Sequence, residues 1–137
     1  MVGSQTSREL EFTSVPENVN KVEAFVEVLK TDLQLSEEME ANILVSLSEA
    51  VNNAIVHGNK NNPAKKVSIK MEKDGNLLSF VVADEGEGFD PAVIIDPTAP
   101  ENLDKPSGRG IFLMRSLADK VEFIDGGRKV NIAFNLA

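Results

Sequence analysis

The chain has 137 residues, the length of one domain, 1–137, that can bury a hydrophobic core. Its 22 acidic and 14 basic residues give a formal net charge of -8 at pH 7, which argues against a nucleic-acid partner bound by phosphate neutralisation. The chain has no cysteine and one histidine, which excludes disulfides, thiolate metal sites and a cysteine nucleophile, and disfavours a multi-histidine metal site.

The first third of the chain predicts one strand and one helix. Leu10 and Phe12 alternate with polar residues, the period of two that is typical of a strand with one buried face. Directly afterwards, Ser14 is the expected capping residue of a helix, with Glu17 three positions further on. Apolar residues then recur at helical spacing over 22–33.

A second helix is predicted from a cap at Ser36 to Gly58, with two faces of different chemistry. One face carries an apolar stripe toward the core, formed by Leu44, Leu47, Val51, Ala54 and Ile55. On the other, Glu49, Asn53 and His57 stand four residues apart and so follow one edge of the helix. A carboxylate one turn from a carboxamide offers a proton acceptor beside a neutral oxygen ligand, which suits a magnesium-bound phosphate and an incoming hydroxyl.

This polar edge also has a simpler interpretation, because glutamate and asparagine on a helix edge are commonly just solvated. His57 precedes Gly58 in the last turn, where a histidine can bond free carbonyls and complement the helix dipole. For His57 alone, capping is the better interpretation.

The second half of the chain predicts two hairpins, separated by a long segment without periodicity and a short helix. The hairpins are 67–71 with 78–82 and 121–123 with 130–136, and the helix is 111–118. Residues 84–110 are rich in glycine and proline and follow no period. A segment of this length inside a compact domain is typical of a functional lid or a disordered loop.

The order strand, two helices, hairpin, long loop, helix, hairpin predicts the fold class. Five strands paired mainly as hairpins, with three helices that cannot all be crossover units, favour a mixed, mostly antiparallel sheet with the helices on one face. We therefore expect an α/β (α+β) two-layer sandwich. The sequence contains no signal peptide and no apolar run of roughly 18 residues, so we expect a cytoplasmic protein without membrane contact.

Two further motifs carry chemistry. Residues 84–88, DEGEG, end a strand with a carboxylate that can accept an amine hydrogen and with glycines that let a flat ring approach the backbone. Residues 107–110, SGRG, lead into a helix, where free backbone amides can cradle an anion. Taken singly, the first motif also fits an ordinary acidic turn and the second a flexible loop ending.

The three motifs together, in this order, resemble the GHKL (Bergerat-fold) ATPase superfamily, and most closely its small anti-sigma factor serine/threonine kinases. EAVNNAIVHG is similar to the family's N box, and DEGEGFD is similar to its first glycine box. SGRGIFLMRSLADKVEF is similar to the second glycine box with the helix and strand that follow it. The resemblance spans about residues 8 to 135 and implies the Bergerat ATP-binding fold.

Carried over residue by residue, the resemblance implies roles for the first two motifs. Glu49 would be the general base, Asn53 the magnesium ligand, and Asp84 the acceptor for the adenine amino group. Gly86 and Gly88 would allow the adenine ring to approach the backbone.

The second glycine box would hold the phosphates of ATP. Gly108 and Gly110 would cradle them at the helix start, and the cofactor-binding positions beside them are Lys105, Ser107 and Arg109. The loop between the two glycine boxes would be the ATP lid.

The chain departs from the family pattern at two places. The arginine that such kinases often carry just before the second glycine box is Pro106 here, with Lys105 one step earlier, so the cation that serves the γ-phosphate is left open. The threonine that usually follows glycine in the final hairpin and supports the adenine carboxylate is replaced by Arg128 or Lys129, after Gly127.

The function that the resemblance implies is that of an anti-sigma factor serine/threonine protein kinase. It would bind ATP with Mg²⁺, sequester a sigma factor and phosphorylate an anti-anti-sigma (STAS-type) partner. From the acidic surface and the apolar residues of the first helix we also expect a homodimer or a stable complex with a sigma factor.

Two alternatives come from other classes. The first is a non-catalytic, nucleotide-responsive protein-binding module of the same fold, favoured by Pro106 and Arg128 and disfavoured by Glu49. The second is a bare structural protein, which a nucleotide thermal-shift assay would separate from both.

Overall fold

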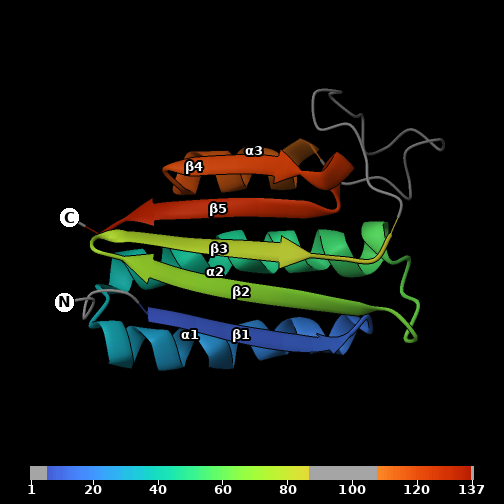
Figure 1. Ribbon diagram of the computed structural model, residues 1–137, viewed down its shortest axis with the longest axis horizontal. Coiled ribbons are helices and arrows are strands. Elements are labelled where there is room, and N and C mark those ends of the chain that lie inside the picture. Colours follow the sequence, from blue (N-terminus) through green and yellow to red (C-terminus); the bar gives the residue numbers. More distant parts are fainter. Residues whose placement is uncertain (1–5, 87–107, 137) are drawn as a thin grey trace.

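The structure, a computed structural model, describes residues 6–86 and 108–136, and these form one five-stranded sheet with helices on one side (Figure 1). The strand order is β1-β2-β3-β5-β4, and each neighbouring pair is antiparallel. The elements are β1 (Thr6–Thr13), the 3₁₀ turn η1 (Pro16–Val19), α1 (Asn20–Leu33), α2 (Glu37–Asn52), the π-helical turn η2 (Asn53–Gly58), β2 (Lys66–Asp74), β3 (Leu77–Ala83), α3 (Gly108–Leu117), β4 (Lys120–Ile124), the 3₁₀ turn η4 (Asp125–Gly127) and β5 (Lys129–Asn135).

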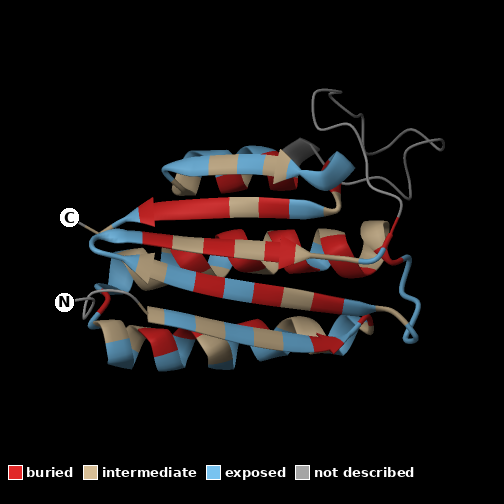
Figure 2. Cartoon of the chain, viewed as in Figure 1, coloured by how far each residue is buried: buried red, intermediate tan, exposed pale blue. Residues whose placement is uncertain are grey.

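The core lies between the helices and the inner face of the sheet, and the period of two in the strands decides which side chains enter it. The register pairs Ile69 with Val82 and Met71 with Phe80, and all four side chains are buried. Phe80 also meets Phe134 edge to face, with 6.1 Å between the ring centroids. Figure 2 shows the resulting alternation, in which buried residues of β2 and β3 alternate with exposed or intermediate ones.

The two long helices bury one side each against this layer. In α2 the residues Ile43, Leu47 and Val51 are fully buried and belong to the same cluster as the inner residues of the sheet. In α1, Val22, Val26 and Leu29 are buried, and Phe25 and Leu33 are half-buried against the same cluster. Val28 stays exposed, at 54%. The apolar residues of α1 therefore serve the core, so they do not by themselves supply the contact patch that the sequence suggested.

The predicted fold class is confirmed: the chain is an α+β two-layer sandwich with five strands and, in the described ranges, three α-helices on one face of the sheet. The described strands include no parallel pair, so the sheet is simpler than the mixed one expected. None of the described helices has the length and apolar character needed to cross a membrane.

One local prediction was wrong, because Ser14 does not cap a helix. Its side chain is buried, and its hydroxyl donates to the carbonyl of Lys65, with 2.8 Å between the two oxygens. Helical structure begins after Val15, which makes no side-chain capping bond. The other predicted cap is confirmed, since Oγ of Ser36 accepts from the amide of Met39 at 3.0 Å.

Four segments from distant parts of the sequence meet at one end of the sheet, on the right in Figure 1. They are η2 at the end of the second helix, the end of β3, the turn η4 between β4 and β5, and the start of α3. The three predicted motifs fall on these segments, so the fold gathers them at one place.

Candidate functional site

The polar edge of the second helix lies beside the start of α3. Glu49 is in the last turn of α2, and Asn53 follows one helical turn later as the first residue of η2. A Cβ on Gly110 would lie 2.7 Å from Oε2 of Glu49 and 3.9 Å from Nδ2 of Asn53. Since only a glycine leaves this space open, the first turn of α3, which begins at Gly108, passes directly over both side chains.

The carboxamide of Asn53 carries an unpaired polar atom. Its Nδ2 is buried and has no hydrogen-bond partner in the described part of the chain. A buried polar group without a partner is costly, and a half-turn of the carboxamide would bring its oxygen to the same position. One neutral protein oxygen, completed by phosphate oxygens and water, is a ligand set that Mg²⁺ accepts.

No set of three or more acidic, histidine or cysteine side chains that could enclose a metal ion occurs within 6–86 and 108–136. A metal at Asn53 would therefore need a second molecule to supply most of its ligands. The phosphates of a nucleotide are such a source, and the residues present fit a magnesium ion that binds together with one.

Asp84 follows β3 and lies against the end of the second helix. Its Oδ1 accepts from the amide of Gly86 at 2.7 Å. A Cβ on Gly58 would overlap the Asp84 carboxylate, and a Cβ on Gly86 would overlap the carbonyl of Gly58. The two glycines therefore allow the 84–86 turn to lie directly against η2. Gly58 was not among the predicted site residues, since its spacing from Asp84 follows no local period.

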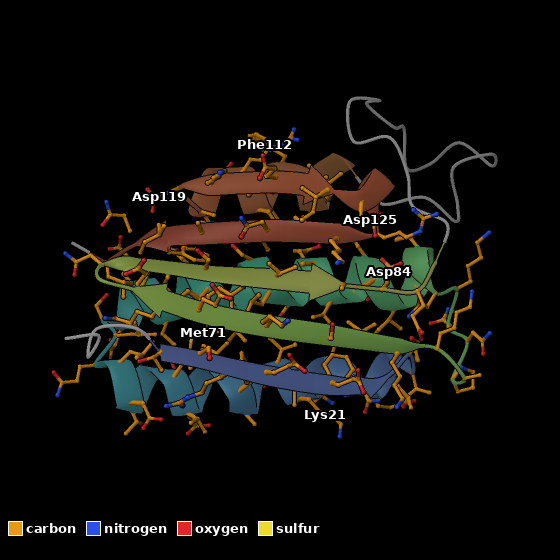
Figure 3. The ribbon with its side chains drawn as sticks, viewed as in Figure 1. Lys21, Met71, Asp84, Phe112, Asp119 and Asp125 are labelled. Carbon is orange, nitrogen blue, oxygen red and sulfur yellow. The ribbon has the colours of Figure 1, made fainter. Side chains whose placement is uncertain are left out.

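Asp84 lies at the end of the sheet (Figure 3). It is half-buried. Burial raises the pKa of its carboxyl above the ordinary value of 3.8, while the hydrogen bond from Gly86 and the charges of Arg128 and Lys65 act in the opposite direction. A carboxylate that is hard to solvate gains more than an exposed one from a further hydrogen-bond donor, such as an amine of a bound ligand.

Asn59 is a central residue of the site that the sequence did not single out. It is 1% exposed, and its Nδ2 donates to Oγ of Ser14 at 2.6 Å and to the carbonyl of Lys66 at 3.0 Å. Its Oδ1 accepts from the amide of Glu85 at 2.8 Å. One buried side chain thus connects the end of β1, the start of β2 and the turn that follows Asp84.

The second helix ends as a π-helical turn, which contains His57. The amide of Asn59 bonds the carbonyl of Ala54, five residues back, at 2.8 Å. Nδ1 of His57 is buried and finds no hydrogen-bond partner among the described residues, so this atom does not make the predicted capping bond. Single π-helical turns occur frequently at functional sites.

The structure also distinguishes the two cations that the sequence left open at the final hairpin. Nε of Arg128 donates to the carbonyl of Gly86 at 2.8 Å. The positive charge of Arg128 also acts to lower the pKa of Asp84. Lys129 is exposed at the start of β5, opposite Ala83. Arg128 is therefore the residue that reaches the site.

Part of the predicted site lies outside the described residues. Gly88, Lys105 and Ser107 fall within 87–107, as does the whole of the predicted lid. Arg109 belongs to the first turn of α3, but only its backbone is described.

The chain is similar to proteins of known families over almost its whole length. The family of histidine kinase-like ATPase domains matches residues 12–134. An anti-sigma F factor of Oceanobacillus iheyensis is 32% identical over 124 residues, which cover 88% of this chain and 84% of that protein. A serine-protein kinase RsbW from the same organism is 27% identical over 120 residues, which cover 83% of this chain and 76% of that protein.

A solved structure has the same fold. It is a crystal structure of the RsbU and RsbW domains of a Mycobacterium tuberculosis protein, and it superposes with a TM-score of 0.67 at 14% sequence identity. The match covers 94% of this chain but 31% of that longer chain. At this identity, the similarity supports the arrangement of helices and strands alone.

Proposed function

This chain belongs to the histidine kinase-like (GHKL) ATPase family, in its anti-sigma factor kinase branch, and we propose that it is an anti-sigma factor serine/threonine protein kinase. It binds ATP with Mg²⁺, sequesters a sigma factor, and phosphorylates a serine or threonine of an anti-anti-sigma partner of the STAS type. The observation that carries the proposal is the close approach of Gly110 to Glu49 and Asn53, since it joins a potential base and a potential metal ligand to a helix start.

The adenine end of ATP is assigned to the 84–86 turn. The Asp84 carboxylate accepts a hydrogen from the adenine amino group, and Gly86 and Gly88 would lie beside the ring. This assignment is supported by the position of Asp84 at the end of β3 and by its raised pKa, because a half-buried carboxylate gains from a hydrogen-bond donor. Guanine carries a carbonyl oxygen in place of that amino group, so the site should prefer ATP to GTP.

The triphosphate is assigned to the start of α3. The free amides at Gly108 and Gly110 face anions favourably because a helix N-terminus carries partial positive charge. Lys105, Ser107 and Arg109 are further candidates for phosphate contacts. Asn53 would hold the magnesium ion, which neutralises phosphate charge and orients the γ-phosphoryl group when it is bound.

Glu49 is the proposed general base. It accepts the proton of the serine or threonine hydroxyl as the hydroxyl oxygen forms a bond to the γ-phosphorus and the bond to ADP breaks. Its position one turn from Asn53, beneath the first turn of α3, supports this role, because the γ-phosphate and the incoming hydroxyl would meet there.

The proposed partners are a sigma factor and an anti-anti-sigma protein, and the proposed assembly is a homodimer in the cytoplasm. The homodimer is proposed to form through the open face of the sheet, where the outer residues in the middle of β3 and β5 are neutral and lie beside the charged Lys70 and Glu72 of β2. The neutral residues are Ser79 and Val81 of β3, paired with Ala133 and Asn131 of β5.

Incubation of the purified protein with Mg-[γ-³²P]ATP and a candidate anti-anti-sigma partner tests the function. The label should appear on one serine or threonine of the partner, and an alanine at that residue should abolish it. Binding of ATP and of the sigma factor without any transfer would instead favour the non-catalytic, nucleotide-responsive module, the alternative that the arginine at position 128 favours.

A further inference from the structure

We propose that Arg128 is a positioning residue for the nucleotide: its guanidinium group and its carbonyl hold the 84–86 turn in the conformation that presents Asp84 to the adenine ring. The proposal rests on the assignment of that turn to adenine under the proposed function.

Arg128 holds the turn at both of its ends. At one end, its carbonyl oxygen accepts from the amide of Asp84 at 2.9 Å. At the other, its Nε donates to the carbonyl of Gly86 at 2.8 Å. A donor and an acceptor of the same residue thus fix two peptide groups on either side of Glu85, which leaves the turn little freedom to rotate.

The remaining amides of the turn are also used. The amide of Glu85 donates to Oδ1 of Asn59 at 2.8 Å, and the amide of Gly86 donates to Oδ1 of Asp84 at 2.7 Å. Asn59 approaches from η2, whereas Arg128 approaches from the final hairpin. The turn is therefore held from two sides, and Arg128 supplies the contact that fixes the Gly86 carbonyl.

Contacts within the turn η4 fix the position of the Arg128 guanidinium group. Nη1 of Arg128 donates to the carbonyl of Asp125 at 3.1 Å and lies 3.9 Å from the carboxylate of the same residue. Gly126 has φ +64°, and a Cβ there would lie 3.2 Å from Nη1. Asp84 and Asp125 appear at the same end of the sheet in Figure 3. Arg128 thus connects the two turns.

The chemistry of this contact requires an arginine. A planar guanidinium can donate from Nε toward Gly86 and from Nη1 toward Asp125 at the same time, whereas a lysine offers one compact charge without a fixed fork. The positive charge has a second effect, because Arg128 and Lys65 are the cations that counteract the effect of burial on the pKa of Asp84. Arg128→Lys keeps that charge and loses the fork, and Arg128→Gln loses both.

Calorimetric titration with Mg-ATP and Mg-ADP between pH 5 and 8 tests the inference on the wild type, Arg128→Lys and Arg128→Gln. Lys129→Gln is the matched control, because it removes the same charge from an exposed neighbouring residue. Both Arg128 variants should bind each nucleotide about tenfold more weakly than the wild type, the equilibrium cost of ordering about one residue when the ligand binds. The losses for ATP and ADP should be equal, because the contact serves the adenine end.

The pH profile separates positioning from a merely structural role. Binding requires an ionised Asp84, so affinity falls as the pH drops through its pKa. In Arg128→Gln that loss should begin at a higher pH than in the wild type, because a cation that lowers the pKa is gone. Arg128→Lys and Lys129→Gln should keep the wild-type profile. Titration of ATP itself is common to all four proteins.

Melting temperatures without nucleotide show whether each variant is folded. If Arg128→Gln is not folded, the nucleotide affinity of Arg128→Lys tests the positioning role by itself. If the wild type binds nucleotide and the Arg128 variants bind it with the same affinity, the positioning role is overturned and the proposed function stands. Variants with lower melting temperatures but the affinity and pH profile of the wild type would overturn the positioning role equally. A wild type that binds no nucleotide would overturn the proposed function, and this inference with it.

Discussion

Asp84 is a side chain whose ionised form lowers the stability of the folded protein. Its carboxyl is half-buried, and desolvation by burial outweighs the hydrogen bond from Gly86 and the charges of Arg128 and Lys65, so that its pKa is raised. A group with this balance destabilises the folded protein when it is ionised, and its ionised form is the one that the proposed adenine contact requires.

Asp84→Asn should weaken ATP binding by about 1 to 3 kcal/mol, because an amide in place of the carboxylate can turn a donor toward the adenine amino group. Calorimetric titration at pH 7 measures this. Asp74→Asn, which makes the same change at an exposed position, should bind like the wild type. Unchanged ATP affinity in Asp84→Asn would remove Asp84 from the site.

The same substitution should change how stability depends on pH. Because the folded pKa of Asp84 is raised above the unfolded value, protonation favours the folded state. The stabilisation is fully present below the unfolded pKa, near 3.8, and is lost as the pH rises through the folded pKa. Asp84→Asn should not lose it. In urea unfolding, the free energy of unfolding of the variant should therefore rise relative to that of the wild type between pH 4 and 7. A constant difference between the two proteins over this range would contradict the effect of burial on the pKa.

Among the elements, the contact between α3 and the second helix is decisive for the site. The Glu49 carboxylate can occupy its present position beneath the start of α3 because residue 110 has no side chain. The atom that a Cβ would meet is the end of a flexible side chain, so a larger residue at 110 would move the carboxylate of Glu49 and leave the packed core in place.

Gly110→Ala should accordingly separate stability from activity. Alanine favours a helix over glycine by up to about 1 kcal/mol, so the melting temperature should be equal or higher. Phosphoryl transfer should fall by at least about tenfold, because the added Cβ pushes the Glu49 carboxylate out of its present position. Ser116→Ala on the exposed side of α3 is the control. Full transfer activity in Gly110→Ala would show that Glu49 does not need its present position.

Secondary structure was largely predictable because burial itself imposes the periods of strands and helices. The alternation through Ile69 and Phe80 and the apolar stripe through Leu47 report on the local chain alone. The interactions of Ser14 and Asn59 were not predictable in this way, since they join residues 45 and 51 positions apart. A polar residue that is buried by a distant segment looks in sequence like one in a loop.

The candidate site was predicted as motifs, and the roles of its residues stay predictions, while its geometry could not be predicted from the sequence. Glu49, Asn53 and Asp84 were found through their spacing and the resemblance, and the structure brings Gly110 onto the first two. Whether Arg128 or Lys129 faced Asp84 depended on the turn η4 and on the residue at which β5 begins. Neither is fixed by a local hydrophobic period.

For the whole molecule, the family assignment is confirmed by the match over residues 12–134 and by the relatives. A nucleotide that binds only the folded chain should stabilise it by about 2.7 kcal/mol at a hundred times its Kd, which for this size raises the melting temperature by about 10 °C. Mg-ATP should give this shift, GTP a smaller one because it lacks the adenine amino group. Equal melting with and without Mg-ATP would favour a bare structural protein.

The most direct test of the kinase is the rate of phosphate transfer to the anti-anti-sigma partner by Glu49→Gln, measured beside its affinity for Mg-ATP. Glu38→Gln, at an exposed position in the first turn of the same helix, is the control and should behave like the wild type. Glu49→Gln should bind Mg-ATP within a few-fold of the wild type and transfer phosphate roughly 10²- to 10⁴-fold more slowly, the usual contribution of a general base. Equal transfer by Glu49→Gln and the wild type would contradict the assigned mechanism, and absence of transfer by the wild type to a partner that it binds would contradict the kinase itself.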